Sequence, residues 1–334
     1  MKIYIILLSI LVSVNVFSQQ YIIKFATLAP EGTTWMNVMK EYDTAIRKES
    51  GGRLGFKMYA GGVQGDEKDV LRKIRIGQIH SSGITGVGIG EIAPKARIMD
   101  SPFLFKSYEE VDHIYKTFDK EFNASFEDGG FVLLGWAEVG FVYIFTNSPI
   151  VKKEDMKNVK MWMWEGDPIA ESAFKTLGIS PIPLSITDVL TSLQTNLIGG
   201  VYTSPLAALG LQWWTRVKYV FSLPLADAAG AVVISKKMYE QLPADLKEIL
   251  LRNGNKFMSK LTAQSRQDNE KALQTLKNKG LKFSDAISKK SITEYDEMGY
   301  KSRRLLINKL YNEDFLNRVE NSLEEFRKSH NISK

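Results

Sequence analysis

The 334-residue sequence contains no cysteine. This absence excludes a disulfide framework, a lipidated N-terminal cysteine and any thiolate metal site. Histidine is also scarce, since the chain has only His80, His113 and His330, far apart in sequence. A zinc or haem site would have almost no ligands to draw on, so we predict neither a metal nor another cofactor.

Long apolar runs are missing after the N-terminus. Residues 1 to 20, MKIYIILLSILVSVNVFSQQ, contain one lysine, an apolar stretch and Ser18 before Gln19, which is typical of a secretory signal peptide. The stretch is shorter than the run of about 20 apolar residues that a membrane-spanning helix needs. We therefore predict a signal peptide over residues 1–18, removed on export, and a mature protein that is soluble, not lipidated and periplasmic.

A concentrated charge of one sign is missing as well. The formal net charge is +6, but lysine and arginine are spread along the chain and form no basic block. Such a distribution is typical of solvated helix faces. It argues against nucleic acid as a partner, whereas an anionic surface or a mildly acidic partner remains open.

Familiar catalytic motifs are absent: the chain has no Walker motif, no G-x-S-x-G and no H-E-x-x-H. The GVGIG segment at residues 86–90 matches a dinucleotide fingerprint only weakly, and Pro94 follows too soon for a long helix. We interpret it as a flexible loop beside a cleft. Glu138 and Glu165, at predicted strand ends, leave open a hydrolase with two carboxylates, while Asp167 is better explained as a helix N-cap. We predict that the protein is not an enzyme.

Hydrophobic periodicity predicts alternating strands and helices, and the same order starts again after Pro149. From Pro243 to about Lys279 only Gly254 interrupts a helical pattern, which predicts a helix of about 35 residues and about 50 Å. That length exceeds the width of one lobe, so we expect this helix to brace two. The predicted strands are residues 21–27, 54–60, 131–136, 141–146, 159–164, 199–202 and 228–235.

The fold class predicted from this order is α/β, with two α/β lobes joined by strands that cross between them. The length of the mature chain also favours two domains. We assign residues 19–146 plus about 228–260 to the first lobe. Residues 147–227 plus about 261–334 form the second.

The segment KMWMW at residues 160–164 is the most informative part of the chain. A strand here sends Met161 and Met163 to one side and Trp162 and Trp164 to the other. Two neighbouring indoles at a strand end either fill a core or line an apolar pocket.

The order of motifs resembles the DctP-type solute receptors of TRAP transporters over nearly the whole mature sequence. The motifs that carry the resemblance are IKFATLAPEGTTW, SGGRLGFKMYAGGVQGDEKDVLRKIRIGQIH, DSPFLFKSYEEV, TNSPIVKKEDMKNVKMWMW, FKTLGISPIPLSITDVLTSLQTNLIGGVYTSP and VVISKKMYEQLPADLKEIL.

The resemblance implies a class II periplasmic-binding-protein-like fold, with two lobes around a cleft and a long helix bracing both. It also implies capture of a small solute and its delivery to the membrane subunits of a TRAP permease. Closure of the lobes on the solute would be the signal that the membrane partner recognises.

The chain departs from the family pattern at three positions. Most members carry an arginine in a K-x-R pattern on this strand to hold a solute carboxylate, but Lys160-Met161 is followed here by Trp162. Ser204 stands where the family usually has asparagine before a proline, and Gly140-Phe141-Val142 replaces a G-F-R type of motif. A guanidinium fork is the natural partner of a carboxylate, so these changes favour an apolar or amphipathic solute.

We expect the ligand to contact aromatic and small polar residues at the cleft. The candidate ligand-binding residues are Trp162, Trp164, Phe141, Tyr143, Glu165, Tyr202, Thr203, Ser204, Trp35 and Trp213.

Several alternatives stay open. Trp162 could plug the cleft without binding anything, or the indoles could stack on a sugar or a cationic head group. Lys160, Arg97 or Arg216 could replace the missing arginine and hold an acid. The protein could also present its ligand to a sensor or to a periplasmic helical-repeat protein.

Overall fold

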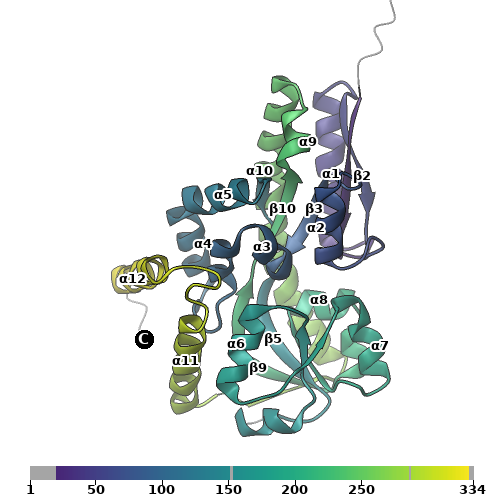
Figure 1. Ribbon diagram of the computed structural model, residues 1–334. Helices are drawn as coiled ribbons and strands as arrows, with labels where there is room; N and C mark the ends of the chain where they lie inside the picture. The colour runs from purple at the N-terminus through teal and green to yellow at the C-terminus, as the bar shows by residue number, and fades with distance from the viewer. Residues whose placement is uncertain (1–19, 151–152, 286, 331–334) are drawn as a thin grey trace, which may run out of the picture.

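The computed structural model describes residues 20–150, 153–285 and 287–330. They form two α/β lobes, and Figure 1 shows the first above the second. The predicted signal peptide lies outside the described residues. None of the helices within the described ranges is long and apolar enough to cross a lipid bilayer.

The first lobe is built on a five-stranded sheet in the order β2-β1-β3-β10-β4. Strand β1 runs parallel to β2 and β3, whereas β10 is antiparallel to β3 and β4. The strands are β1 (Tyr21–Thr27), β2 (Leu54–Tyr59), β3 (Ser81–Thr85), β4 (Phe131–Trp136) and β10 (Gly230–Ser235).

Helices cover both faces of this sheet. Residues of α1 (Thr34–Glu49) and α10 (Ala244–Asn278) pack in one core, against one face. The other face packs against four helices and a 3₁₀ segment: α2 (Glu67–Arg75), α3 (Gly86–Ile92), η1 (Pro94–Asp100), α4 (Tyr108–Thr117) and α5 (Asp119–Asp128). A short helix, α9 (Lys236–Glu240), follows β10.

The second lobe contains a four-stranded sheet in the order β11-β9-β5-β8 and a parallel pair, β6-β7. Its strands are β5 (Gly140–Thr146), β6 (Trp162–Trp164), β7 (Ile182–Leu184), β8 (Gly200–Thr203), β9 (Tyr219–Ala228) and β11 (Lys282–Phe283). Its helical segments are η2 (Lys153–Asn158), α6 (Pro168–Leu177), η3 (Ile186–Asp188), α7 (Val189–Gln194), α8 (Pro205–Gly210) and η4 (Trp213–Arg216).

The long helix α10 has the predicted length of 35 residues. It contacts α1 and β4 in the first lobe and α8 and β5 in the second, so the predicted α/β fold with a bracing helix is confirmed. Gly254 allows its close approach to β4, because a Cβ there would collide with the carbonyl oxygen of Leu134. Gly254 therefore serves close packing, and helix α10 continues through it without a break.

Strand β9 was not predicted over most of its length. Pro224 lies inside it, and a proline usually argues against a paired strand. The register between β5 and β9 shifts between Val142 and Ile144, next to the unpaired stretch that contains Pro224. The proline is therefore accommodated at an irregularity in the ladder.

The C-terminal helices divide between the lobes. Helix α11 (Lys289–Arg304) contacts α6 of the second lobe. Helix α12 (Glu313–Ser329) packs on α4, and Leu316, Val319 and Leu323 join the core of the first lobe. The predicted division had assigned this helix to the second lobe, and the lobe boundaries as such remain a prediction.

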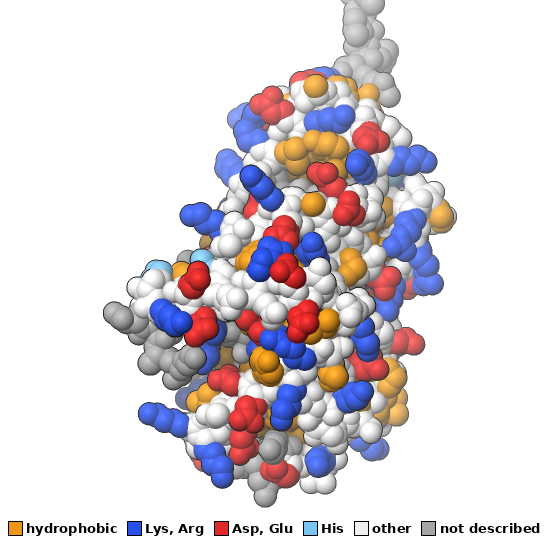
Figure 2. Space-filling view, turned by 60° about the vertical axis from the view of Figure 1, so that its left-hand side comes forward, with side chains coloured by type: hydrophobic (Ala, Val, Ile, Leu, Met, Phe, Trp, Pro, Cys, Tyr) orange, Lys and Arg blue, Asp and Glu red, His pale blue; other side chains and the backbone are white. Residues whose placement is uncertain are grey.

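Charges of both signs are interspersed on the face shown in Figure 2, with no extended basic patch on that face.

Candidate functional site

A cavity of about 250 Å³ lies between the lobes, and its surface is mostly apolar. The first lobe contributes Thr27, Trp35, Glu67, Thr85, Arg97 and Asp100. The second lobe contributes Trp162, Trp164, Asp167, Tyr202, Thr203, Ser204 and Trp213. The segments that cross between the lobes add Val139, Val142, Leu225 and Asp227.

Four rings of the second lobe, Trp162, Trp164, Tyr202 and Trp213, form what we call the aromatic wall. The Trp162 ring stacks on Tyr202 at 4.9 Å and meets Trp213 edge-on at 5.3 Å. Its Nε1 donates a hydrogen bond to the carbonyl of Leu184 at 3.0 Å. With 1% of its surface exposed, Trp162 is held in place by packing on several sides.

The predicted alternation along this strand is confirmed. Trp162 and Trp164 belong to the cluster that contains the aromatic wall, whereas Met161 and Met163 pack in a separate core cluster. Regular pairing covers only Trp162–Trp164, which is shorter than predicted.

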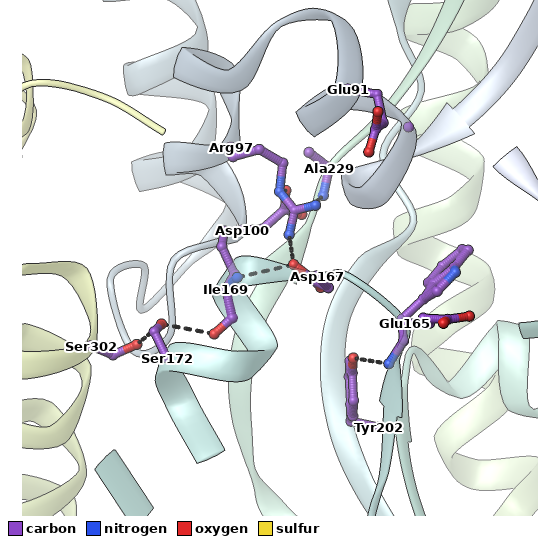
Figure 3. A network of polar contacts seen from close by, with 12 residues as sticks. Glu91, Arg97, Asp100, Glu165, Asp167, Ile169, Ser172, Tyr202, Ala229 and Ser302 are labelled. Atoms are coloured by element: carbon purple, nitrogen blue, oxygen red, sulfur yellow. Dashed lines mark hydrogen bonds and ion pairs between the residues drawn. The ribbon is translucent and has the colours of Figure 1, made fainter. Parts of the chain in front are cut away.

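A buried ion cluster forms the polar part of the cavity (Figure 3). Arg97 Nη2 lies 2.8 Å from Asp167 Oδ1 of the second lobe, and Arg97 Nε lies 3.1 Å from Asp100 Oδ2. Burial by itself would lower the pKa of Arg97, but the charges of Asp167 and Asp100 raise it overall. Burial raises the pKa of Asp100 to about 6, even though the guanidinium opposes this change.

The glycine-rich segment at residues 86–90 is the start of helix α3 and not the flexible loop that we predicted. Its glycines make room for charged side chains. A Cβ at Gly86 would lie 2.9 Å from Asp100 Oδ2 and 3.0 Å from Arg97 Cζ, and one at Gly88 would lie 2.8 Å from Glu67 Oε2.

Glu67 is buried beside this helix. Its carboxylate accepts hydrogen bonds from the backbone N–H and hydroxyl of Thr85 and from the N–H of Gly88. Burial raises its pKa to about 7 in spite of these bonds. Glu67 is therefore a fully hydrogen-bonded carboxyl group in the cavity lining, and its protonation changes near neutral pH.

The lobes also contact each other through Asp66, the N-cap of α2. Its Oδ2 accepts hydrogen bonds from Trp164 Nε1 at 3.1 Å, from Ser185 Oγ at 2.6 Å and from the N–H of Ile186 at 3.3 Å. All three donors belong to the second lobe. Together with the Arg97–Asp167 pair, these bonds join the two lobes directly.

Seven of the ten candidate ligand-binding residues line the cavity: Trp35, Trp162, Trp164, Tyr202, Thr203, Ser204 and Trp213. Ser204 has a second task, since its Oγ caps α8 by accepting from the N–H of Ala207. The binding role of these seven residues remains a prediction.

The other three candidates, Phe141, Tyr143 and Glu165, are absent from the described cavity lining. Side chains alternate along a strand, and Val142 takes the cavity side of β5, which sends Phe141 and Tyr143 to the opposite face. Phe141 packs against Tyr108 instead. Glu165 is exposed in the turn after β6.

The three residues that could replace the missing arginine differ in where they lie. Arg97 lines the cavity, whereas Lys160 and Arg216 are exposed at the surface. Glu138 is committed to Arg266 through two bonds of 2.9 and 2.6 Å and, like Glu165, is not part of the cavity lining. The two carboxylates of the alternative hydrolase therefore do not meet in this cavity.

Sequence reasoning missed three acids of the cavity lining, Glu67, Asp100 and Asp227. Asp227 is fully buried, and neither of its carboxyl oxygens accepts a hydrogen bond from the residues that the structure describes. A signal was present, because Asp100 follows the apolar Ile98-Met99 and Asp227 stands between Ala226 and Ala228. A charged residue inside an apolar run is expected to be buried. Because charged side chains are seldom fully buried, such a position indicates a specific role. No group of three or more His, Asp or Glu side chains in the described part of the chain could hold a metal ion.

Comparison with known proteins agrees with this geometry. Residues 25–301 match the DctP family, described as bacterial extracellular solute-binding protein, family 7. A solute-binding protein of Verminephrobacter eiseniae is 25% identical over 247 residues, which cover 73% of each chain. The C4-dicarboxylate-binding periplasmic protein DctP of Rhodobacter capsulatus is 22% identical over 82% of each chain.

A solved structure with the same fold is the sugar acid binding protein DctPAm of Advenella mimigardefordensis in complex with galactonate. It superposes with a TM-score of 0.84 at 21% sequence identity and covers 92% of this chain and 99% of its own. The family match spans most of the present chain, and members of this family are binding receptors and not enzymes. The chain therefore belongs to the DctP family, the solute-binding receptors of TRAP transporters.

Proposed function

We propose that this receptor acts in the periplasm, captures a small apolar or amphipathic solute and delivers it to the membrane subunits of a TRAP permease. The observation that carries the proposal is Trp162. This residue stands where the family usually has a carboxylate-binding arginine, and its indole is part of the cavity wall. An apolar ring offers a carboxylate no charge-assisted hydrogen bond.

The energetics support a solute with an apolar body. Burial of five or six methylene groups against the aromatic wall would contribute roughly 4 to 5 kcal/mol at about 0.8 kcal/mol each. Ordering costs reduce this gain, so useful affinity needs one or two hydrogen bonds to a polar end. Tyr202, Thr203 and the ion cluster around Arg97 lie within the same lining.

Delivery depends on the two lobes. A solute that touches both sides of the cavity favours the closed state by the difference between its affinities for the closed and open states. The Asp66 and Arg97–Asp167 contacts between the lobes assist closure. The membrane subunits would then recognise the closed surface.

A second candidate is an acidic solute held by Arg97. Two observations favour it: Arg97 Nη1 has no hydrogen-bond partner among the described residues, and two of the similar proteins are named for a C4-dicarboxylate and for a sugar acid. Against it, the guanidinium is already paired with two carboxylates.

Mass spectrometry of the solute that co-purifies from the periplasm tests the choice. We expect an organic molecule with an apolar body, released on denaturation and lost from a Trp162→Ala variant. Recovery of a dicarboxylate or a sugar acid in an amount close to one per protein would contradict the proposal and support the second candidate.

A further inference from the structure

The charge balance around the cavity bears on the polar end of the solute, an inference that rests on the function proposed above. Among the described residues that line the cavity, Glu67, Asp100, Asp167 and Asp227 carry carboxyl groups, and Arg97 alone carries a positive charge. The lining therefore has a surplus of acid. In a cavity with low-dielectric walls, such a surplus attracts cations and repels anions over several ångströms.

The single guanidinium does little to offset this surplus for a ligand. Only 3% of the Arg97 side chain is exposed, and its two closest charges are Asp167 and Asp100. Its unpartnered Nη1 lies against the glycines of α3, 3.0 Å from a Cβ built on Gly86 and 3.7 Å from one built on Gly90. The charge of Arg97 is thus balanced by carboxylates of the protein itself.

The acids, in contrast, retain unused hydrogen-bonding capacity. Asp227 is fully buried, and neither of its carboxyl oxygens accepts a hydrogen bond from the described part of the chain. Burial, with the nearby charge of Glu138, raises its pKa well above the ordinary value. The Asp227 carboxyl therefore keeps its proton over a wider pH range, and a positively charged ligand could replace that proton as the compensating charge.

Asp167 offers a direct contact. Within the described chain its hydrogen bonds, from Arg97 Nη2 at 2.8 Å and from the N–H of Ile169 at 3.0 Å, both fall on Oδ1. This leaves Oδ2 as an acceptor for a ligand. The hydroxyl of Tyr202 accepts from the N–H of Trp164 at 3.2 Å, and the indoles around it attract positive charge through their π faces.

From these observations we infer that the polar end of the solute is an organic cation, an alkylammonium or a related amine, which lies between Asp167 and the aromatic wall. The apolar body then fills the rest of the cavity. A carboxylate in the same place would lie beside Asp167, and the Arg97 guanidinium is already paired with Asp167 and Asp100.

Three probes with the same body and different ends test this inference: hexylamine, hexan-1-ol and hexanoate. An alkylammonium stays protonated at pH 7.5, since its pKa is close to that of lysine, about 10.4. Isothermal titration calorimetry would use protein purified from the periplasm, stripped of solute by unfolding and refolded. We expect hexylamine to bind at least about tenfold more tightly than hexanol, a difference of about 1.4 kcal/mol, and hexanoate to bind most weakly.

The outcomes separate the two proposals. Equal binding of hexylamine and hexanol, with weak hexanoate, overturns the cation inference and leaves the amphipathic solute standing. Preference for hexanoate overturns the cation inference and favours the acid-binding candidate. Absence of binding by all three overturns both the cation inference and the apolar body.

Variants add a second measurement. Asp167→Asn and Asp227→Asn should each reduce the preference for hexylamine over hexanol, the first by direct contact and the second through the field. Glu171→Gln is the matched control, because it removes the same charge from an exposed position on the helix that Asp167 caps. Circular dichroism checks folding. Asp227 forms no ion pair with the described residues, so an unchanged preference in Asp227→Asn counts against the inference.

Discussion

The two sides of the cavity differ in kind. The first lobe contributes mainly polar and charged groups, such as Arg97, Asp100 and Glu67, whereas the second contributes the aromatic wall. The polar groups are fixed by bonds within the protein, which leaves little freedom to change them. The rings contact one another by packing, and the Nε1 groups of Trp162 and Trp164 also donate hydrogen bonds to Leu184 and Asp66. The difference suggests that the rings of the second lobe determine which body fits, whereas the tolerated charge depends on Arg97 and Asp100 of the first lobe together with Asp167 of the second.

The largest expected effect comes from removing the centre of the aromatic wall. Trp162→Ala should lower the free energy of unfolding by about 3 to 5 kcal/mol, because it leaves a large hole in a packed cluster. Urea denaturation measures the change. Trp214→Ala is the control, since Trp214 is only partly buried at the edge of the same cluster, and it should cost much less. Equal losses of stability in the two variants would show that Trp162 is not the packing centre of the aromatic wall.

On the charged side, Arg97→Met should lower the free energy of unfolding by about 3 kcal/mol at pH 8, since two buried carboxylates lose their partner. At pH 5 the loss should be smaller, because the pKa of Asp100 is already about 6 with the arginine present and rises further without it. Arg216→Met, at an exposed position, should change nothing at either pH. A loss that is independent of pH would contradict this account of the ion cluster.

The contact between the two sides can be loosened through Asp66. Asp66→Ala removes an acceptor of three hydrogen bonds from the second lobe and should cost about 2 kcal/mol, by leaving donors unpaired that are buried in whole or in part. Small-angle X-ray scattering of the solute-free protein should show a larger radius of gyration. Asp188→Asn, nearby and exposed, should leave the radius unchanged. No expansion in the Asp66 variant means that other contacts keep the lobes together.

The smallest expected effect concerns Asp227 and depends on pH. Its pKa is raised in the folded protein, so between the ordinary and the raised value the unfolded chain releases a proton that the folded chain keeps. Stability therefore falls as pH rises through this window. Asp227→Asn removes the fall, so the stability of this variant relative to the wild type should improve between pH 5 and pH 8. Urea titrations at both pH values measure it, and a constant difference would refute the raised pKa.

Local pattern was sufficient for much of the fold. The period of side chains predicted β1 and α10, and alternation along residues 160–164 placed Trp162 and Trp164 on the same side. These features depend on neighbours in the sequence. Arg97 was also named from the sequence, as a possible replacement charge. Only the folded chain shows which carboxylates it pairs with.

The missed features depend on distant residues. The bond between Arg97 and Asp167 joins positions 70 apart in sequence, and no periodicity reports it. Asp167 was predicted as an N-cap and does cap α6, but its second partner was invisible. Likewise, the amphipathic pattern of α12 shows that it buries one face and cannot show on which lobe. Pro224 hid β9, because the bulge that tolerates it is a property of the pair of strands.

The bond from Trp164 Nε1 to Asp66 has an optical consequence. The indole belongs to one lobe and its acceptor to the other, so separation of the lobes would expose that N–H to water. Indole emission shifts to longer wavelength in water, which means that the chain contains its own fluorescent indicator of closure. A Trp164→Phe variant supplies the blank, and the difference between the two spectra would follow opening and closing in solution without any attached dye.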